Sequence, residues 1–460
     1  MWIMLKKTAS LVILLLLLNG LFIPADVVSG GNQTDVEVMV RGLNFRLGPG
    51  TQYYSLDVLP GGTGLSVLAE ENGWMLVRKE SGETGWVAGW FTSNPEKPIK
   101  PEDPEEEKRT GEKVVGYYPY WAAYSGYSPH DIEVEKVTHI NYAFANIGDD
   151  LRITMGDPNI DPDNFSQFKS LKEEHPHLQT LISVGGWTWS DKFSDVALTE
   201  ASRRAFAESA VEFIVEHGFD GIDVDWEYPV RGGHSSNTSR PEDKQNFTLL
   251  LEALRSELDA QEKRDGGEYL LTIAGGAHRG YVENVELDII HEYLDFANIM
   301  TYDIHATWEA HTGFNAPLYE INSDSPQYSW SVDSAVNAWL NAGFPAEKLV
   351  MGMPFYGYKY QGVVNANDGL FQYFWDGSAL GYSEIADNYL GAAGFDRYFH
   401  HEAQVPWLFN GSTFISYEDE ESLSLKAEYI NSHGLAGAMV WELSHDPDAI
   451  LLKALYRSLQ

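Results

Sequence analysis

The sequence contains no cysteine. This absence excludes a disulfide framework, a thiol nucleophile and any metal site built on cysteine sulfur. Small secreted proteins of eukaryotes commonly depend on disulfides, so an extracellular protein without them is more typical of bacteria.

Basic residues are scarce as well. There are 31 Lys and Arg against 68 Asp and Glu, which gives a formal net charge of −37. Such a charge opposes binding to nucleic acid or to anionic membranes, and we expect neither as a partner. The sequence also lacks a Gly-x-Gly-x-x-Gly motif after any predicted strand, so nothing supports a dinucleotide cofactor.

Long apolar runs are absent after the first residues. Lys6 and Lys7 precede an apolar stretch over residues 11–23, and small residues follow it. A basic start, a short apolar core and small residues predict a secretory signal peptide over residues 1–31. We therefore expect a secreted, extracellular protein with no membrane span after signal removal; an uncleaved anchor is the alternative.

Residues 35–93 show short apolar strands separated by glycine turns, which predicts a small all-β domain. The sequences Leu-Asn-Phe-Arg-Leu-Gly-Pro at 43–49, Gly-Trp at 73–74 and Gly-Trp-Val at 85–87 resemble a bacterial SH3-like domain. The resemblance implies binding to the cell wall or another polymer. In a barrel this small we expect Trp74 and Trp86 to be core residues.

Residues 94–113 form the predicted linker. Pro95, Pro98, Pro101 and Pro104 recur every third residue, which is the repeat of a polyproline II helix, and three glutamates follow at 105–107. Such a segment is a semi-rigid spacer.

From residue 114 to 460, predicted strands and helices alternate, which favours a (β/α)8 barrel over a doubly wound open sheet. A helix over 199–217 closes at Gly218. The next helix is predicted to begin with a capping box of Ser239 and Glu242, with Pro241 in its first turn. The expected strands cover residues 113–118, 137–144, 180–184, 221–227, 270–274, 296–302, 349–355 and 437–441.

The fourth predicted strand carries an unusual set of acids. Successive strand residues face opposite sides, so Asp223, Asp225 and Glu227 share one face while Ile222, Val224 and Trp226 share the other. Buried like charges are costly and raise one another's pKa, which favours a catalytic role. A solvated edge strand is one alternative. A calcium loop is another, but it needs glycine where Tyr228 stands.

This stretch has the form Asp-x-x-Asp-x-Asp-x-Glu followed by Tyr-Pro, and it resembles the signature of glycoside hydrolase family 18, the chitinase family. The similarity extends to other strand ends and covers nearly all of residues 114–460. It implies a (β/α)8 TIM barrel with a small α+β insertion, placed at about 358–413. It further implies a chitinase that cleaves β-1,4 linkages between N-acetylglucosamine units with net retention, using the substrate's acetamido group as nucleophile.

The resemblance also assigns roles. Glu227 is the acid, Asp225 orients the acetamido N–H, Tyr302 binds its carbonyl oxygen, and Asp223 holds a shared proton. We expect repulsion from Asp225 to raise the pKa of Glu227. Tyr117 and Ser183 match positions that support Asp223, and Trp441 matches the apolar floor. The substrate-binding positions implied are Tyr117, Phe144, Ser183, Gly186, Trp187, Tyr228, Met300, Asp303, Tyr356 and Trp441.

We expect no cofactor and no metal, because no histidine pair has ligand spacing at the strand ends. His400 and His401 lie in the insertion and are expected at the surface. The expected partners are chitin or N-acetylglucosamine oligosaccharides, and we expect a monomer. A cell-wall or spore-cortex N-acetylglucosaminidase is an alternative. A chitin-binding lectin ranks lower, because such lectins typically lose the acid that Glu227 supplies here.

Overall fold

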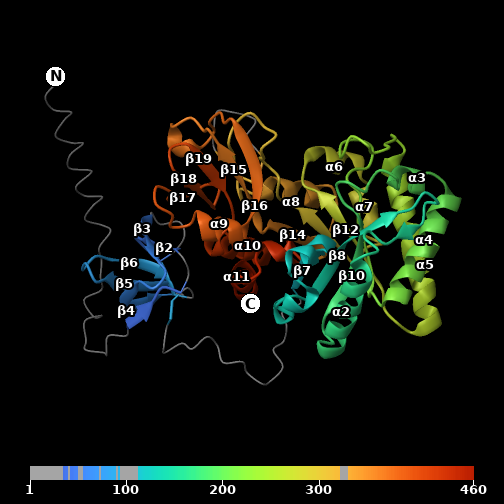
Figure 1. The fold of residues 1–460 in the computed structure, drawn as a ribbon, viewed down its shortest axis with the longest axis horizontal. Coiled ribbons are helices and arrows are strands. Elements are labelled where there is room, and N and C mark those ends of the chain that lie inside the picture. Colours follow the sequence, from blue (N-terminus) through green and yellow to red (C-terminus); the bar gives the residue numbers. More distant parts are fainter. Residues whose placement is uncertain are drawn as a thin grey trace. The chain divides into compact units, whose positions relative to one another are not determined.

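A computed structural model describes residues 112–321 and 330–460, and residues 35–93 with gaps at 40–41, 50–54, 72–73 and 90–91 (Figure 1). The predicted signal peptide and nearly all of the predicted linker lie outside the described residues. The chain divides into two compact units, residues 1–107 and 108–460. The exact domain limits given above stay predictions.

The N-terminal unit is a six-stranded antiparallel sheet of order β1-β4-β5-β6-β2-β3. Trp74 packs against its buried cluster, as expected, but Trp86 is only half-buried and lies outside that cluster. Along β6, Gly85 and Val87 face the core and Trp86 faces the other side, so the expectation for Trp86 is wrong. The strands are β1 (Asp35–Glu37), β2 (Gly42–Arg46), β3 (Ser55–Pro60), β4 (Gly64–Glu71), β5 (Trp74–Lys79) and β6 (Thr84–Ala88).

The second unit is a closed barrel of parallel strands. β8 pairs with β7 and β10, and β20 pairs with β14 and β7. Each of the eight barrel strands therefore has a neighbour on both sides, and the sheet closes on itself. The barrel strands are β7 (Lys113–Pro119), β8 (His139–Ile147), β10 (Gln179–Gly185), β11 (Gly221–Asp225), β12 (Leu270–Gly276), β13 (Phe296–Met300), β14 (Leu349–Pro354) and β20 (Gly437–Trp441).

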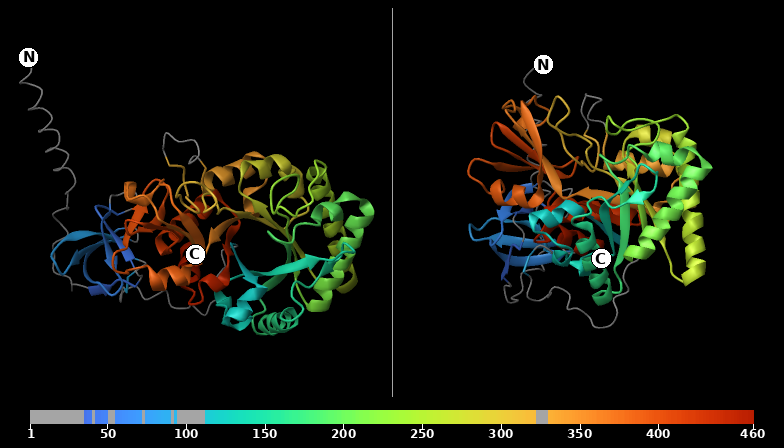
Figure 2. Two further views of the ribbon diagram at one scale, coloured as in Figure 1. Left: turned by 45° about the horizontal axis from the view of Figure 1, so that its top comes forward. Right: turned by 45° about the vertical axis from the view of Figure 1, so that its right-hand side comes forward.

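Helices surround this barrel (Figures 1 and 2). They are α2 (Asp161–Glu174), α3 (Phe193–Leu198), α4 (Glu200–His217), α5 (Asp243–Asp265), α6 (Arg279–Asn284), α7 (Leu287–Ile290), α8 (Val332–Asn341), α10 (Glu420–His433) and α11 (Ile450–Leu459).

The helix layer orients the acidic strand. Ile222, Val224 and Trp226 are buried on the side of β11 that faces the helices. The ring of Trp226 stacks on Phe193 of α3 at 5.5 Å and meets Phe247 of α5 edge-on at 5.4 Å. Since side chains alternate along a strand, this packing directs Asp223 and Asp225 to the barrel interior.

One helix start differs from its prediction. α5 begins at Asp243, and its N-cap residue Glu242 makes no side-chain capping bond, so the predicted capping box of Ser239 and Glu242 is wrong. Instead the Asp243 carboxylate accepts hydrogen bonds from the backbone N–H of Arg240 at 2.7 Å and from Ser194 at 2.6 Å. By contrast α4 ends at Gly218 with a positive φ of 77°, as expected.

The insertion between β14 and β20 is a five-stranded antiparallel sheet of order β16-β15-β19-β18-β17 with one helix. In both views it lies at the end of this unit away from α4 and α5 (Figures 1 and 2). His400 is partly buried there and packs on Phe314, so its expected surface position is wrong. The elements are β15 (Tyr356–Gln361), β16 (Asp376–Gly381), α9 (Tyr382–Asn388), β17 (Asp396–His400), β18 (Val405–Phe409) and β19 (Thr413–Ser416).

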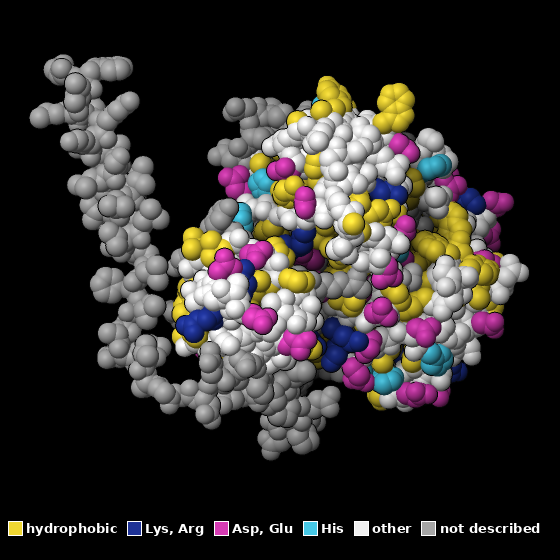
Figure 3. Space-filling view, turned by 60° about the vertical axis from the view of Figure 1, so that its left-hand side comes forward, with side chains coloured by type: hydrophobic (Ala, Val, Ile, Leu, Met, Phe, Trp, Pro, Cys, Tyr) yellow, Lys and Arg dark blue, Asp and Glu magenta, His cyan; other side chains and the backbone are white. Residues whose placement is uncertain are grey.

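Within the described residues, no helix combines the length and apolarity that crossing a bilayer requires. The face drawn in Figure 3 carries more acidic than basic side chains, which agrees with the net charge of −37.

Candidate active site

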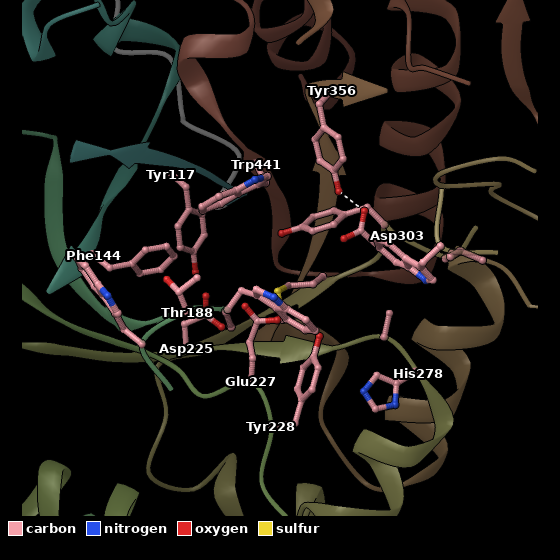
Figure 4. A pocket seen from close by; sticks show the side chains of 18 of the residues that line it. Tyr117, Phe144, Thr188, Asp225, Glu227, Tyr228, His278, Asp303, Tyr356 and Trp441 are labelled. Carbon is pink, nitrogen blue, oxygen red and sulfur yellow. Dashed lines mark hydrogen bonds between the residues drawn. The ribbon is translucent and has the colours of Figure 1, made fainter. Parts of the chain in front are cut away.

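A cleft of about 840 Å³ opens at the C-terminal ends of the barrel strands. Glu227 and Tyr228 line it in the lower part of the view, with Tyr117, Phe144 and Trp441 to the left and Asp303 and Tyr356 to the right (Figure 4). The cleft brings together most of the predicted site residues: Tyr117, Phe144, Trp187, Asp225, Glu227, Tyr228, Met300, Tyr302, Asp303, Tyr356 and Trp441. Asp223, Ser183 and Gly186 are buried behind its wall.

Asp223 lies deepest of the three acids and is fully buried. Its Oδ2 accepts hydrogen bonds of 2.7 Å from both the Tyr117 hydroxyl and the Ser183 hydroxyl. Its Oδ1 accepts one of 2.6 Å from Thr272 and a longer one of 3.5 Å from Asn298. Burial raises the pKa of Asp223, and these four donors oppose that rise by stabilising the carboxylate.

Two of these donors were not predicted. Strand register could have found Thr272, because Ser183, Asp223 and Thr272 stand directly beside one another on β10, β11 and β12. Asn298 on β13 follows the same inward alternation but at a different level. A row of short polar residues at the same level of neighbouring parallel strands therefore indicates which residues donate hydrogen bonds to a buried acid.

Asp225 is buried, and its Oδ1 has no hydrogen-bond partner in the part of the chain that the structure describes. Burial raises its pKa well above the ordinary value, and the charges of Glu227 and Asp223 add to the rise. Its backbone is fixed, since its carbonyl oxygen accepts bonds from Gly186 N at 2.9 Å and the Ser190 hydroxyl at 3.1 Å. The environment of Asp225 thus favours its protonated form, and Oδ1 is left without a partner among the described residues at the cleft.

Glu227 lies two residues beyond the end of β11 and is half-buried. Its backbone N–H donates to the Ser190 hydroxyl at 2.9 Å, so one serine positions both Asp225 and Glu227. Burial raises the pKa of Glu227 to about 7, and the charge of Asp303 contributes. Burial rather than repulsion from Asp225 is therefore the main cause, which corrects the expected order.

The opposite wall holds a fixed carboxylate. Asp303 Oδ1 accepts hydrogen bonds from the hydroxyls of Tyr356 and Tyr358, the latter at 2.7 Å. Its backbone N–H donates to Asn315 at 2.8 Å. Near it, the Tyr302 hydroxyl makes only a long contact of 3.8 Å to Met439 Sδ among the described residues. That hydroxyl is therefore available to a ligand in the cleft.

Aromatic rings form the rest of the cleft. Trp441 stacks on Phe144 at 5.8 Å and contacts Tyr117 at 5.5 Å. Trp187 and Trp308 are 51% and 69% exposed, which leaves ring faces open to a sugar. Lining residues outside the predicted set, several of them on loops that no strand pattern places, are Tyr120, Trp121, Thr188, Trp189, Ala274, Ala277, His278, Ile304, Trp308 and Trp330.

Gly186 shapes this cleft without lining it. Its φ is +73°, and an added Cβ would lie 2.7 Å from the Phe144 ring. The position therefore requires glycine both for its backbone and for the close ring.

A (β/α)8 barrel with buried acids beneath an aromatic cleft at its strand ends has the design of a carbohydrate-cleaving enzyme. The family model described as glycosyl hydrolases family 18 matches residues 113–446, and that of the bacterial SH3 domain matches residues 41–93. The chain therefore belongs to family 18 of the glycosyl hydrolases.

Named relatives agree with this family. The chain is 42% identical to Chitinase A1 of Niallia circulans, over 75% of this chain and 58% of that protein. It is 36% identical to Chitotriosidase-1 of Mus musculus, over 73% of each. The chain thus matches little more than half the length of Chitinase A1.

Solved structures show the same likeness. Chitinase ChiA74 from Bacillus thuringiensis superposes with a TM-score of 0.72 at 38% identity, over 76% of this chain and 69% of that one. A family 18 N-acetylglucosaminidase from Paenibacillus barengoltzii gives 0.70 at 41% identity, over 76% of this chain and all of that one.

Proposed function

We propose that the chain is a secreted chitinase that hydrolyses β-1,4 linkages between N-acetylglucosamine units, with the substrate's acetamido group as nucleophile. The observation that carries this proposal is the unpaired Oδ1 of Asp225, buried beside Glu227 at the cleft. A buried acceptor without a donor is costly, and the N–H of an acetamido group supplies the donor. The names of the relatives, chitinases in most cases, agree with this substrate.

In the first step, Glu227 protonates the glycosidic oxygen as the bond to the anomeric carbon breaks. A pKa of about 7 keeps a large share of this carboxyl protonated at neutral pH. The acetamido carbonyl oxygen attacks the same carbon, forming a cyclic cation. Asp225 accepts a hydrogen bond from the amide N–H, and the Tyr302 hydroxyl donates a hydrogen bond to the carbonyl oxygen of the same amide.

In the second step, the ionised Glu227 takes a proton from water, and the water oxygen attacks the anomeric carbon. The acetamido group leaves that carbon, so two inversions give net retention. Behind Asp225, the carboxylate of Asp223 accepts four hydrogen bonds, which stabilise its negative charge. The apolar face of Trp441 supports the sugar ring. Further proposed contacts come from Tyr117, Phe144, Trp187, Tyr228, Met300, Asp303 and Tyr356. Behind the cleft wall, Ser183 donates to Asp223, and Gly186 leaves room for the Phe144 ring.

The test compares the native chain with Glu227→Gln. The amide cannot act as an acid, so we expect hydrolysis of chitotetraose to disappear while calorimetric binding of the oligomer remains. Substantial turnover by this variant would refute the assignment of Glu227. A cellulose oligomer is the matched substrate control, since it has no acetamido group; its hydrolysis would remove the proposed mechanism.

Likeness to an N-acetylglucosaminidase supports a second candidate, the release of single sugars or action on cell-wall glycan. Incubation with chitotetraose and peptidoglycan side by side, with products followed over time, separates the two. The SH3-like unit is proposed to bind cell-wall polymer, and the signal-like start supports export. Co-sedimentation with isolated cell wall tests the first point, with the full chain expected to sediment more strongly than a chain that lacks residues 35–93.

A further inference from the structure

The opposite end of the barrel carries a cluster that the catalytic proposal does not use. Glu135 lies in the 3-10 helix Val134–Lys136 before β8, and His175 and His177 lie in the turn between α2 and β10. Within the described part of the chain, these three form the one group of histidine and acidic side chains whose ligand atoms, one from each, lie within 4.8 Å of one another. His175 Nδ1 is 2.7 Å from Glu135 Oε1.

Two imidazole nitrogens and one carboxylate oxygen are the ligand set of zinc and related divalent ions. In a tetrahedral site with bonds of about 2.1 Å, ligand atoms are about 3.4 Å apart. The widest separation, at most 4.8 Å, would shrink by up to about 1.4 Å, and the 2.7 Å between His175 Nδ1 and Glu135 Oε1 would lengthen by about 0.7 Å. Partly exposed side chains can make both changes. We propose that Glu135, His175 and His177 bind a divalent transition-metal ion of the zinc class, with water as fourth ligand.

The backbone already holds the two histidines in place. His175 ends α2 with its N–H donating to Leu171 O at 2.7 Å, and its own carbonyl accepts from Leu178 N at 3.0 Å. His177 Nε2 is 3.2 Å from the carbonyl oxygen of Val134. A proton on Nε2 would satisfy that contact and leave Nδ1 free as a ligand, which is the usual arrangement of a metal-binding histidine.

The position of the cluster indicates whether a bound ion would affect stability or hydrolysis. Its ligands precede β8 and β10, which pair directly from His139 and Gln179 onward. A bound ion would therefore link the segments that lead into the two neighbouring strands β8 and β10. β10 is seven residues long, so the cluster lies roughly 20 Å from the strand ends that carry the cleft. The expected effect is on stability and not on hydrolysis.

The experiment uses the full, untagged chain after removal of metal with a chelator. Titration with zinc chloride, followed by calorimetry, should show one saturable site, and zinc should raise the melting temperature in a way that EDTA reverses. His177→Asn and His175→Gln should each weaken zinc binding at least tenfold. His130→Gln is the matched control, since His130 is an exposed histidine whose Nδ1 lies 2.9 Å from Gln167 Oε1 and which is outside the cluster.

The outcomes separate cleanly. Zinc binding that is lost in both cluster variants and kept in His130→Gln supports the site. Absence of saturable binding, or binding by His177→Asn equal to that of the native chain, overturns it. Chitin hydrolysis that is the same with and without zinc supports a stabilising role, and hydrolysis lost on chelation overturns that role. Because Glu227→Gln is tested separately, failure of the metal site leaves the proposed activity untouched.

Discussion

The Tyr117 hydroxyl donates a 2.7 Å hydrogen bond to Asp223 Oδ2 inside the barrel, whereas the next residue, Tyr118, points outward and donates to Tyr127 O. Two adjacent tyrosines on β7 thus belong to different parts of the protein. One stabilises the deepest acid of the site, and the other packs between barrel and helices.

Replacing Tyr117 by Phe should therefore lower kcat/KM about tenfold or more. A hydrogen bond to a buried charged group stabilises that charge by about 1.5–3 kcal/mol. Its loss would change how readily Asp223 holds a proton beside Asp225, and so the activation free energy. Initial rates on a defined chitin oligomer measure this effect. Tyr118→Phe is the control, expected to cost about 1 kcal/mol of stability and to leave kcat/KM unchanged. Equal kinetic losses in both variants would contradict the distinction.

The pH profile of hydrolysis should report Glu227. As the proposed acid, Glu227 must be protonated to act, and its pKa is raised to about 7, so kcat/KM should fall as pH rises through about 7. The charge of Asp303 contributes to that raised pKa. Asp303→Asn should therefore move the alkaline limb to lower pH, whatever it does to the maximal rate.

Asp149→Asn is the control for this pH shift, because Asp149 is exposed and paired with Lys192. Its alkaline limb should coincide with that of the native chain. An Asp303→Asn profile that is unmoved, or that moves to higher pH, would contradict the electrostatic role of Asp303.

Gly186→Ala should damage the cleft as well as the backbone. A left-handed residue costs about 1–2 kcal/mol when it carries a Cβ, and here that Cβ would also displace the Phe144 ring beside Trp441. We expect a lower melting temperature and a raised KM. Gly434→Ala, at the end of α10, has a φ of +62° and no atom within 4 Å of the added Cβ. It should lower stability alone, and a matching rise in KM would argue against the steric explanation.

A buried ion pair near the start of α10, between Lys426 and Glu418, should contribute strongly to the free energy of unfolding. Lys426 and Glu418 are 0% and 2% exposed, and Lys426 also donates to Ala316 O at 2.8 Å. Lys426→Met leaves a buried carboxylate without its partner and should cost about 3–5 kcal/mol in urea unfolding. The exposed pair Arg204–Glu208 is the control, and Arg204→Gln should leave the midpoint nearly unchanged. Restoration of stability by Lys426→Met with Glu418→Leu would support this explanation.

The sequence predicted the barrel because its strands alternate with helices, and the acidic face of β11 because Ile222, Val224 and Trp226 need an apolar layer on the other side. Local pattern sufficed where one face is buried by neighbours close in sequence. The family resemblance then supplied positions such as Tyr302 and Trp441, which lie far along the chain from Glu227 and share no local pattern with it.

The misses have physical causes. The start of α5 was misplaced because Asp243 turns its carboxylate back to Arg240 and Ser194, contacts that depend on tertiary structure. Trp86 faces outward because Val87 takes the core position beside it. Thr272 lies beside Asp223 through the register of β12 on β11, and the pattern within either strand alone does not fix that register. The pKa of Glu227 follows mainly from burial, which also needs the folded chain.

The pairing of β20 with β7 brings Val440 beside Gly116, so the last strand of the barrel closes the sheet against the first. During synthesis, β7 must wait for nearly the whole unit before it gains its second neighbour. Until then two strand edges stay open to other chains. Premature termination anywhere before β20 should thus yield aggregates and not a shorter working enzyme, so the last few dozen residues control the yield of folded enzyme.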